Sequence, residues 1–487
     1  MKKYIKNSLI IFGFSLALIS CSNYLDIQPE DKYIEEIVFS TESSVQNVIN
    51  GIYIDMADNN TYGGNLTLST IEVLAQRYNA FGSDHAYHDL ANYRYTQSGV
   101  QTTFDAIWTN MYIRILNINK AIENLEVNIA NIPLERLNIL KGELIGLRAM
   151  LHFDLLRLYG PIYSVDSGAE SIPYHSDSNT DIKPLLPASE IISKINQDLE
   201  MSVTLLNNDP VKTFGKIDVS QQDDNSTGFE GTPFYRFRNL RFNYFAAKAI
   251  QARVFLYAGM KNEASIAAKE VINGATQWFN WVNINDVISP SGSPDRIFSS
   301  EVIFGLQNTS LYDRYDELFS PNLNDGAILA PVSTRLDETF DNNLNDIRYS
   351  PSWRVPTNAS KTYKVFYKFS DVSSASSFRY TQPLIRMSEM HYIAAETETD
   401  LNIATNYLNN VRQNRGLSDL DPLMIDLPLE ILKEYKREFY GEGQLFFFYK
   451  RNNLSQIEDG SDSSGDITMD AIKYVIPLPN SELDFRD

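Results

Sequence analysis

The sequence predicts a mainly α-helical protein in which the helices come in pairs. Apolar residues recur at every third or fourth position in several long segments, and this spacing gives a helix one apolar face. Short turns separate the members of each pair, and segments with the alternation typical of strands are few. Because a helix pair leaves one apolar face uncovered, neighbouring pairs are expected to stack and bury it.

The first long helices are expected in the N-terminal half. Thr41 is a suitable N-cap for a helix over 41–52. Residues 104–125 and 137–158 carry unbroken apolar stripes and are predicted to form the first pair. The first member is expected to end near Pro133, and the second at the Gly-Pro step that directly follows it.

Two more pairs are expected further along the chain. Residues 242–257 and 264–272 form the second, and their alanines would allow the close helix crossing of a tetratricopeptide repeat. Residues 384–395 and 404–411 form the third, with Asp400 near the turn. The irregular inserts between pairs are predicted at 161–187, 208–240 and 273–383. We therefore expect one helical-repeat body over residues 41–487.

The remaining segments give weaker signals. Short strands are predicted at 301–306, 363–367 and 474–476. A polar stretch rich in Gly and Tyr runs from 59 to 103, and its middle, 77–95, shows no sustained period and is predicted to be loop. The run of Gly, Ser and Asp at 459–466 predicts a mobile surface loop.

The N-terminus predicts export. Lys2, Lys3 and Lys6 precede the apolar run Leu9–Ile19, which is the layout of a secretory signal peptide over 1–20. The apolar run is shorter than the roughly 20 residues that a membrane-spanning helix needs. A cleaved signal is therefore preferred to a retained anchor.

Cys21 is the only cysteine in the chain, and it completes a Leu-Ile-Ser-Cys sequence like the lipobox of bacterial lipoproteins. The alternative, a chance buried thiol, fits this position less well. We predict acylation of Cys21 and an extended tether over 21–40. Attachment to a bilayer through two or more acyl chains is stable.

The composition limits the class of partner. The chain has 487 residues, a net charge of −20 and a pI near 4.7. A strongly acidic exported protein is a poor candidate for binding nucleic acid or an anionic membrane surface. Beyond the signal, no second membrane-spanning segment is predicted, so the acyl group is the expected membrane contact.

A series of short motifs matches a known family over nearly the whole chain. In chain order they are Cys21-Ser22-Asn23-Tyr24-Leu25-Asp26, Asn50-Gly51-Ile52-Tyr53, Trp108 with Tyr112, Leu147-Arg148-Ala149, Tyr159-Gly160-Pro161, Ala252-Arg253-Val254, Ile385-Arg386-Met387, Arg415-Gly416-Leu417, Glu438-Phe439 with Glu442-Gly443, and Ile476-Pro477. Each motif alone is weak. In this order and behind a lipobox, they resemble the SusD/RagB lipoproteins of Bacteroidetes.

The resemblance implies a right-handed scaffold of tetratricopeptide-like helix pairs with ligand-facing inserts. It also implies a lipid-anchored outer-membrane protein that faces the cell surface. Such a protein binds a nutrient oligomer, usually a glycan and in some members a peptide, and delivers it to a SusC-like TonB-dependent barrel. No cofactor, metal or catalytic residue is implied.

The chain departs from the family pattern at a few positions. Ser388 stands where the family usually has Ala. Tyr435 and Leu445 replace usual arginines, and Phe448 replaces a usual Asp. We expect that aromatic packing takes the place of a local ion network here, an exchange that can be neutral or stabilising.

The candidate ligand contacts are aromatic residues in irregular segments. They are Tyr78, Tyr87, Tyr93, Tyr95, Trp281 and Trp353. An aromatic ring in a loop must bury its face, and a sugar or the protein's own insert can cover it. Trp108 lies on a core stripe and is excluded. The acidic composition favours neutral glycans over polyuronates.

Other chemistries have less support. His85 and His88 have a spacing that could hold a metal, but a solvated loop is the simpler interpretation because no strong third ligand is visible. His152 and His391 are expected to pack in the core. A surface-anchored hydrolase remains a second alternative after peptide binding, although no hydrolase motif is present.

Overall fold

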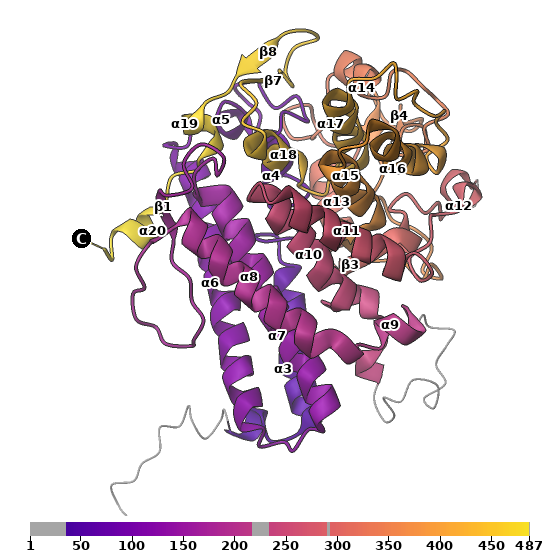
Figure 1. Ribbon diagram of the computed structural model, residues 1–487. Coiled ribbons are helices and arrows are strands. Elements are labelled where there is room, and N and C mark those ends of the chain that lie inside the picture. The colour runs from indigo at the N-terminus through magenta and orange to yellow at the C-terminus, as the bar shows by residue number, and fades with distance from the viewer. Residues whose placement is uncertain (1–35, 217–232, 290–292, 487) are drawn as a thin grey trace, which may run out of the picture.

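The structure is a computed structural model that describes residues 36–216, 233–289 and 293–486. Long helices dominate (Figure 1), and they pack in a continuous series, the helix row, in which each contacts the next. In order along the row they are α3 (Glu42–Met56), α6 (Ser98–Val127), α7 (Leu134–Tyr159), α8 (Ala188–Leu205), α10 (Tyr244–Tyr257), α11 (Lys261–Ala275), α15 (Met387–Thr397) and α16 (Leu401–Gln413). Each packs against the next. The expected mainly α fold of stacked helix pairs is confirmed.

Helix α3 begins where the sequence predicts. Thr41 Oγ1 accepts a hydrogen bond from Ser44 N at 3.1 Å, and Ser44 Oγ accepts one from Thr41 N at 3.2 Å. This capping box satisfies amide groups that a helix start otherwise leaves unpaired.

The packed body begins slightly before the predicted boundary at residue 41. Residues 36–38 are helical and Phe39 is buried, so the last part of the predicted 21–40 tether belongs to the body. The predicted signal peptide over 1–20 and the predicted lipidation site Cys21 lie outside the described residues.

Helices α6 and α7 carry the predicted stripes of the first pair. α6 ends at Val127, earlier than expected, because Asn128 adopts the left-handed conformation that closes many helices (φ 51°). α7 starts directly after Pro133 and ends at Gly160, as predicted.

Helix α8 lies on the other side of α7, and the sequence pattern did not single it out. Two glycines of α7 allow its neighbours to come close. A Cβ at Gly142 would crowd the side chain of Leu206, and one at Gly146 would overlap the ring of Phe242. The glycines therefore set the spacing of α7 from the chain that follows α8 and from the start of α10.

The second and third pairs are confirmed as α10 with α11 and α15 with α16. Gly259 takes a positive φ of 76° in the turn of the second pair. Asp400 caps α16 by accepting from Asn402 N at 2.8 Å. One residue assigned to the third pair is misplaced: Leu384 belongs to a strand, and α15 starts only at Met387.

Strands in the described residues form two-stranded antiparallel sheets. They are β1 (Glu170–Ile172) with β2 (Leu186–Pro187), β3 (Val302–Gln307) with β6 (Thr381–Arg386), β4 (Trp353–Arg354) with β5 (Val365–Phe366), and β7 (Gln456–Glu458) with β8 (Asp466–Thr468). The strand predicted at 301–306 is confirmed, and that at 363–367 shrinks to β5. The strand predicted at 474–476 is wrong, because Tyr474 ends a short helix. Residues 459–466 lead from β7 into β8.

Further helices complete the body. They are α4 (Thr70–Leu74), α5 (His88–Ala91), α9 (Val211–Phe214), α12 (Ile284–Ile288), α13 (Leu311–Phe319), α14 (Ser333–Thr339), α17 (Leu427–Glu438), α18 (Leu445–Arg451), α19 (Ala471–Tyr474) and α20 (Asn480–Leu483), with 3-10 turns at Leu206–Asn208, Pro233–Tyr235, Arg238–Leu240 and Ser299–Glu301. The predicted loop at 77–95 is thus interrupted by α5. No helix of the described segments has the length and apolar character to cross a bilayer.

A network of buried ion pairs ties α17 to the chain around β3 and β6. Glu438 pairs with Arg386, with Arg415 at 2.7 Å and with Arg348 at 3.0 Å. Arg415 also binds Glu301 at 2.6 Å. Burial acts to raise the pKa of Glu438, but Arg415 and Arg386 hold that pKa well below its ordinary value. The carboxylate therefore stays ionised inside the protein.

The positions that depart from the family pattern pack against one another, and the exchange of aromatic for ionic contacts stays a prediction. The rings of Tyr435 and Phe448 pack with centroids 4.5 Å apart, and Phe439 lies 5.1 Å from Tyr435. Leu445 is buried as well. Apolar contacts join α17 and α18 at this point.

Candidate ligand-binding cleft

An open cleft of about 680 Å³ lies beside the C-terminal half of α3. Four separate parts of the chain line it: residues 50–58, Arg114 of α6, residues 234–241, and residues 307–310, which begin at the last residue of β3. Its volume falls within the roughly 300–1,000 Å³ of typical ligand pockets. The row of helices thus supplies the floor, and two inserts supply the walls.

The floor is fixed by Tyr53. Its hydroxyl donates to Glu143 Oε2 at 3.0 Å and accepts from Phe242 N at 2.8 Å. Burial, and then the Glu143 carboxylate, raise the pKa of Tyr53 well above its ordinary value, so the hydroxyl stays protonated. The ring is half-buried and helps to line the cleft.

One wall is built around Arg241. Its guanidinium lies 3.5 Å from the centroid of the Phe234 ring, and Nη2 donates to Asn50 Oδ1 at 2.5 Å. Nη1 lies 3.8 Å from Glu143 Oε2 and has no hydrogen-bond partner in the described structure. Burial lowers the pKa of Arg241, although Glu143 opposes this. Phe237, half-buried in the same wall, has a positive φ of 54°.

The wall is held to the helix row by Arg238. This fully buried side chain donates from Nε and Nη2 to both oxygens of Asp209, at 2.9 and 2.8 Å, and from Nη1 to Glu143. The carboxylates raise the pKa of Arg238 even though burial acts to lower it. A planar guanidinium matches a carboxylate in this paired geometry better than an ammonium does. The position of the wall is therefore set from inside the protein.

The opposite wall is the turn between β3 and α13. Asn308 is buried, and its side chain donates to Gln382 Oε1 at 2.8 Å and accepts from Ser310 N at 3.0 Å. These contacts leave Gln307 and Thr309 exposed at the cleft.

The cleft carries charges of both signs. Arg114 donates from Nε and Nη2 to the carbonyl oxygen of Asp55, at 2.9 and 2.7 Å, so the carboxylate of Asp55 remains exposed at the edge. Asp58 is exposed beside it. Burial lowers the pKa of Arg114.

This arrangement offers a ligand both apolar faces and hydrogen-bonding groups. Half-buried aromatic rings offer apolar faces, and amide, hydroxyl and carboxylate groups offer hydrogen bonds in several directions. Within the residues described, no group of His, Cys, Asp and Glu comes together that could hold a metal ion.

Most of the aromatic residues proposed from the sequence are in the interior. Tyr78, Tyr93, Tyr95 and Trp353 are buried. Tyr93 donates to Leu74 O at 2.8 Å and Tyr95 to Lys473 O at 2.5 Å, while Trp353 packs 4.5 Å from Phe366. This burial favours the packing role for these four. The polar sequence around them concealed that the stretch from 59 to 103 folds compactly.

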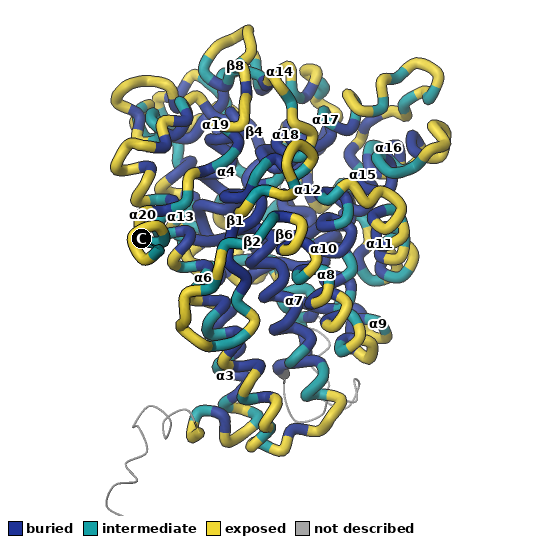
Figure 2. The backbone as a smooth tube through the Cα atoms, turned by 60° about the vertical axis from the view of Figure 1, so that its left-hand side comes forward, coloured by how far each residue is buried: buried dark blue, intermediate teal, exposed yellow. Residues whose placement is uncertain are grey.

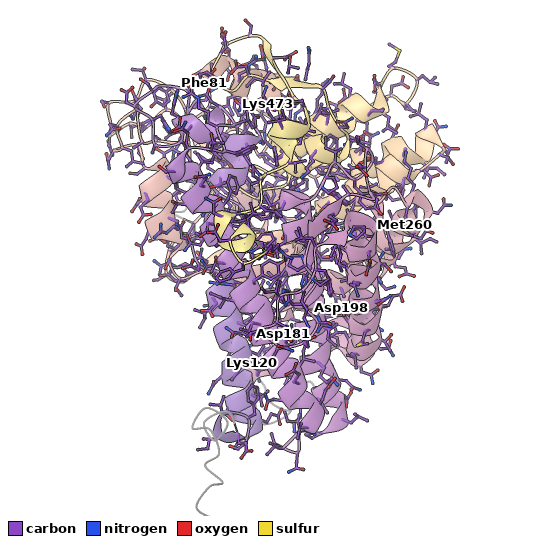
Figure 3. All side chains as sticks on the ribbon, turned by 90° about the vertical axis from the view of Figure 1, so that its left-hand side faces the viewer. Phe81, Lys120, Asp181, Asp198, Met260 and Lys473 are labelled. Carbon is purple, nitrogen blue, oxygen red and sulfur yellow. The ribbon has the colours of Figure 1, made fainter. Side chains whose placement is uncertain are left out.

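Tyr87 and Trp281 are the accessible members of that set, being half-buried. Tyr87 lies 6.1 Å from the His85 ring, in the loop that also carries the exposed Phe81, which Figure 3 places at the upper end of the molecule. Trp281 packs 5.1 Å from His391. Neither lines the cleft, and ligand contact by the six proposed residues stays a prediction.

The histidines make contacts within the protein. His85 Nε2 is 3.2 Å from Ile328 O, and His88 Nδ1 is 2.6 Å from Phe81 O. His152 and His391 are buried, as expected, and so is Trp108.

Sequence reasoning missed most cleft residues. Tyr53 appeared only as part of a family motif, and Arg114 is one of several polar residues on an amphipathic helix, so neither stood out. A usable signal was present in the insert at 234–241, where Phe, Tyr and Arg alternate without either helical or strand periodicity. Such interleaving favours a recognition surface over a core element.

Comparison with known proteins gives matches along both halves of the chain. A family model described as "Starch-binding associating with outer membrane" matches residues 23–218, and the SusD family model matches residues 274–484. A SusD-like protein from Formosa agariphila is 26% identical over 202 residues, which is 41% of this chain. The match covers only 37% of the length of that relative.

Solved structures share the fold. A SusD superfamily protein from Bacteroides thetaiotaomicron superposes with a TM-score of 0.72 at 21% identity, over 91% of this chain and 98% of the other. A SusD-like carbohydrate binding protein from Bacteroides vulgatus gives a TM-score of 0.65 at 17% identity, over 91% and 96% of the two chains. The likeness extends over nearly the whole described body.

Proposed function

Because the chain belongs to the SusD/RagB family, we propose that it is a carbohydrate-binding protein of the cell surface. The observation that carries this proposal is the cleft, in which aromatic faces lie beside groups that can hydrogen-bond hydroxyls. The family description, starch binding in association with the outer membrane, supports the same conclusion.

A sugar ring has one face made largely of C–H groups and an edge of hydroxyls. The half-buried rings of Phe237 and Tyr53 would contact the C–H face. Gln307, Thr309 and Asp55, which are exposed, would bind the hydroxyls. Because the cleft is open to solvent, a longer chain could extend beyond it.

The finer proposal concerns attachment and delivery. We propose that Cys21 is acylated and that the protein stands on the outer membrane beside a SusC-like TonB-dependent barrel, to which it passes its ligand. The lipobox sequence and the family membership support this. A tethered binding site works at high local concentration near the pore, so a modest affinity is sufficient.

Two alternatives give different results in the same assays. A peptide-binding member of the family would retain peptides from protein digests and ignore glycans. A surface hydrolase would turn over a glycan, and that turnover would be lost on changing one pair of carboxylates.

The test is binding of the lipidated protein, purified in detergent, to a panel of neutral and acidic oligosaccharides and to digested peptides. Phe237→Ala and Gln307→Ala should each weaken glycan binding by about tenfold, the effect of losing one stacking or hydrogen-bonding contact. Lys120→Ala, at an exposed position of α6 outside the cleft, is the control (Figure 3). Unchanged binding in both cleft variants would contradict the assignment of the cleft.

Tyr87→Ala and Trp281→Ala test the residues proposed from the sequence. If either variant binds glycan more weakly while the cleft variants bind normally, the binding site is assigned to that residue and not to the cleft.

A further inference from the structure

Arg296 is a buried arginine that lacks a carboxylate partner. It is 6% exposed, and its Nη2 donates to Ser370 Oγ at 2.7 Å. Its Nε has no hydrogen-bond partner, and its guanidinium forms no ion pair with any described residue. Arg253, which is 7% exposed, instead binds both oxygens of Glu389, at 2.7 and 2.6 Å. Because a guanidinium without a counter-charge is costly to bury, an anion placed near Arg296 would be stabilised.

Arg354 supplies a second unpaired positive charge beside Arg296. It ends β4 at an exposed position, and its guanidinium lies 4.0 Å from the centroid of the Tyr367 ring. Across the described ranges it has no ion-pair partner. The turn that follows Tyr367 leads to Ser370, whose amide donates to Tyr367 O at 3.0 Å. Burial, and then the charge of Arg354, lower the pKa of Arg296 to about 10, which is the effect of one cation on another nearby.

Tyrosine rings lie around the two guanidinium groups. The ring of Tyr315 in α13 has its centroid 6.4 Å from that of Tyr367. Tyr312, three residues earlier on the same helix, is half-buried and packs 5.0 Å from Tyr380. α13 contains both buried and exposed residues, so one side of it belongs to the surface (Figure 2). Half-buried rings beside an arginine can be covered by the C–H face of a sugar.

The tyrosines of this group adjoin the cleft. The amide of Asn308, in the cleft wall, donates to Tyr380 O at 2.8 Å, and Tyr380 N donates to the hydroxyl of Tyr312 at 3.3 Å. Tyr380 has a positive φ of 67°, a conformation that a tyrosine keeps only where its surroundings hold it. A ligand that extends out of the cleft past Thr309 and Ser310 therefore comes to Tyr312.

The nearby carboxylates leave the two arginines unneutralised. Asp371 binds Arg379 through both oxygens, at 3.1 and 3.0 Å. Asp295 accepts from the amide of Ser299 at 3.0 Å and from its hydroxyl at 2.8 Å. Asp316 is exposed on α13 and opposes the arginines only in part. The local charge is therefore positive, although the whole chain carries −20. Exposed charges farther away than about 8 Å are largely screened at physiological salt, so the local charge governs binding here.

We propose that Arg354, supported by the buried charge of Arg296, binds the acidic group of an anionic glycan that also occupies the cleft. The acidic group is a uronate carboxylate or a sulfate ester, either of which accepts two parallel hydrogen bonds from a planar guanidinium. The inference rests on the proposed carbohydrate-binding function and names its class of ligand. It reverses, at this site, the preference for neutral glycans that the net charge of the chain favours.

The test compares sugars that differ only in charge. Tetragalacturonate is paired with its methyl ester, and a sulfated dextran oligosaccharide is paired with the unsulfated one. Binding of each to the lipidated protein in detergent is measured at low and at physiological salt. We expect the charged member of one pair to bind at least about tenfold more tightly, as one charge-assisted contact predicts, and this preference to fall with salt. The pair that shows the preference identifies the acidic group.

Three variants and a control assign the preference to these residues. Arg354→Gln and Arg296→Met should each reduce the preference to less than about threefold, with little change in affinity for the neutral sugars. Asp316→Asn removes the exposed carboxylate and should strengthen binding of the charged sugar by about twofold. Lys120→Gln removes one positive charge at an exposed position of α6 and should leave the preference unchanged (Figure 3).

The outcomes separate this inference from the proposed function. Equal affinity for both members of each pair, with Phe237→Ala still weakening binding, overturns the anionic site and leaves the proposed function intact. A preference that survives in both Arg354→Gln and Arg296→Met overturns the assignment to these arginines. Absence of binding to every glycan overturns both proposals together.

Urea unfolding gives a readout that is independent of affinity. Because Arg296 has no carboxylate partner to leave unpaired, Arg296→Met should not lower the urea midpoint, whereas Arg253→Met should lower it. The charged oligosaccharide that binds, at saturation, should raise the midpoint of the unaltered protein more than that of Arg296→Met. An equal loss in Arg296→Met and Arg253→Met would show that Arg296 is compensated inside the protein and would overturn its role.

Discussion

The Arg238→Met variant tests the inference that the cleft wall is held from inside by buried charges. Methionine has a volume close to that of the arginine side chain but cannot donate hydrogen bonds or carry charge. The change therefore leaves Asp209 and Glu143 buried as carboxylates without their shared cation, since the side chains of all three residues are fully buried.

The magnitude follows from the contacts that remain. Removing one partner of a buried ion pair destabilises a protein by about 3–5 kcal/mol. Asp209 would keep hydrogen bonds from the amides of Val211 at 2.9 Å and Tyr244 at 3.0 Å, and Glu143 would keep the hydroxyl of Tyr53 at 3.0 Å. Because these bonds partly compensate the carboxylates, we expect the lower end of the range, about 3 kcal/mol.

Urea unfolding of the purified protein measures this loss. Adding Glu143→Gln and Asp209→Asn to Arg238→Met removes the unpaired charges and should restore part of the stability. Arg94→Met is the matched surface control: its ion pair with Asp89 spans 3.2 Å, the two side chains are 51% and 41% exposed, and such pairs contribute about 0–1 kcal/mol. If Arg238→Met and Arg94→Met unfold at the same urea concentration, the reasoning about the wall is wrong.

Three further predictions concern the interior. Phe448→Asp should destabilise the protein by about 3–5 kcal/mol, because it places a carboxylate against the ring of Tyr435, whose centroid lies 4.5 Å from that of Phe448. Adding Tyr435→Arg should recover at least about 1 kcal/mol in a double-mutant cycle. Additive losses in that cycle would refute the exchange of aromatic for ionic contacts. Burial, and then Arg415, lower the pKa of His391 from 6.5 to about 4, so the folded protein favours the neutral ring. The free energy of unfolding therefore has its full value above pH 6.5 and falls by up to roughly 3 kcal/mol as the pH falls toward 4. His391→Gln should flatten the stability profile between those pH values, and an unchanged slope would count against the buried neutral histidine. Burial raises the pKa of Glu72 from 4.5 to about 7, so the contribution of Glu72 to the free energy of unfolding is present below pH 4.5 and is lost as the pH rises through 7. Glu72→Gln should therefore increase the free energy of unfolding at pH 8 by about 1–3 kcal/mol. A decrease at that pH would show that the Glu72 charge is better compensated than its burial indicates.

The sequence was sufficient to predict the long helices where one periodic stripe ran without interruption. α7 is the clearest case, because its leucines keep one face from start to finish and Pro133 and Gly160 mark both ends. Prediction failed where the apolar spacing of a helix continued into a neighbouring strand. Leu384 continues the spacing of the residues after Met387, yet it lies in β6, because a buried strand and a buried helix can both consist of continuous apolar sequence.

The cleft was beyond sequence reasoning for a different reason. Its lining comes from residues 50–58, 114, 234–241 and 307–310, which are brought together only by packing of the row and its inserts. Aromatic residues in polar sequence were a poor guide, since Tyr78 and Trp353 fill the interior. The charged residue that positions a wall, Arg238, gave no local signal because its partners Asp209 and Glu143 are distant in the chain.

The residues that hold the cleft wall in place are different from the residues that line the cleft, and this separation affects which positions can change. Glu143, Asp209 and Arg238 keep the insert in place, while the half-buried Phe237 and the exposed Gln307 and Thr309 line the cleft. Exchanges at the exposed positions 307 and 309 should change the lining of the cleft with little effect on the framework, because exposed substitutions typically change stability by less than about 0.5 kcal/mol. The lining of the cleft can therefore vary without loss of the fold, as long as the buried guanidinium of Arg238 is retained.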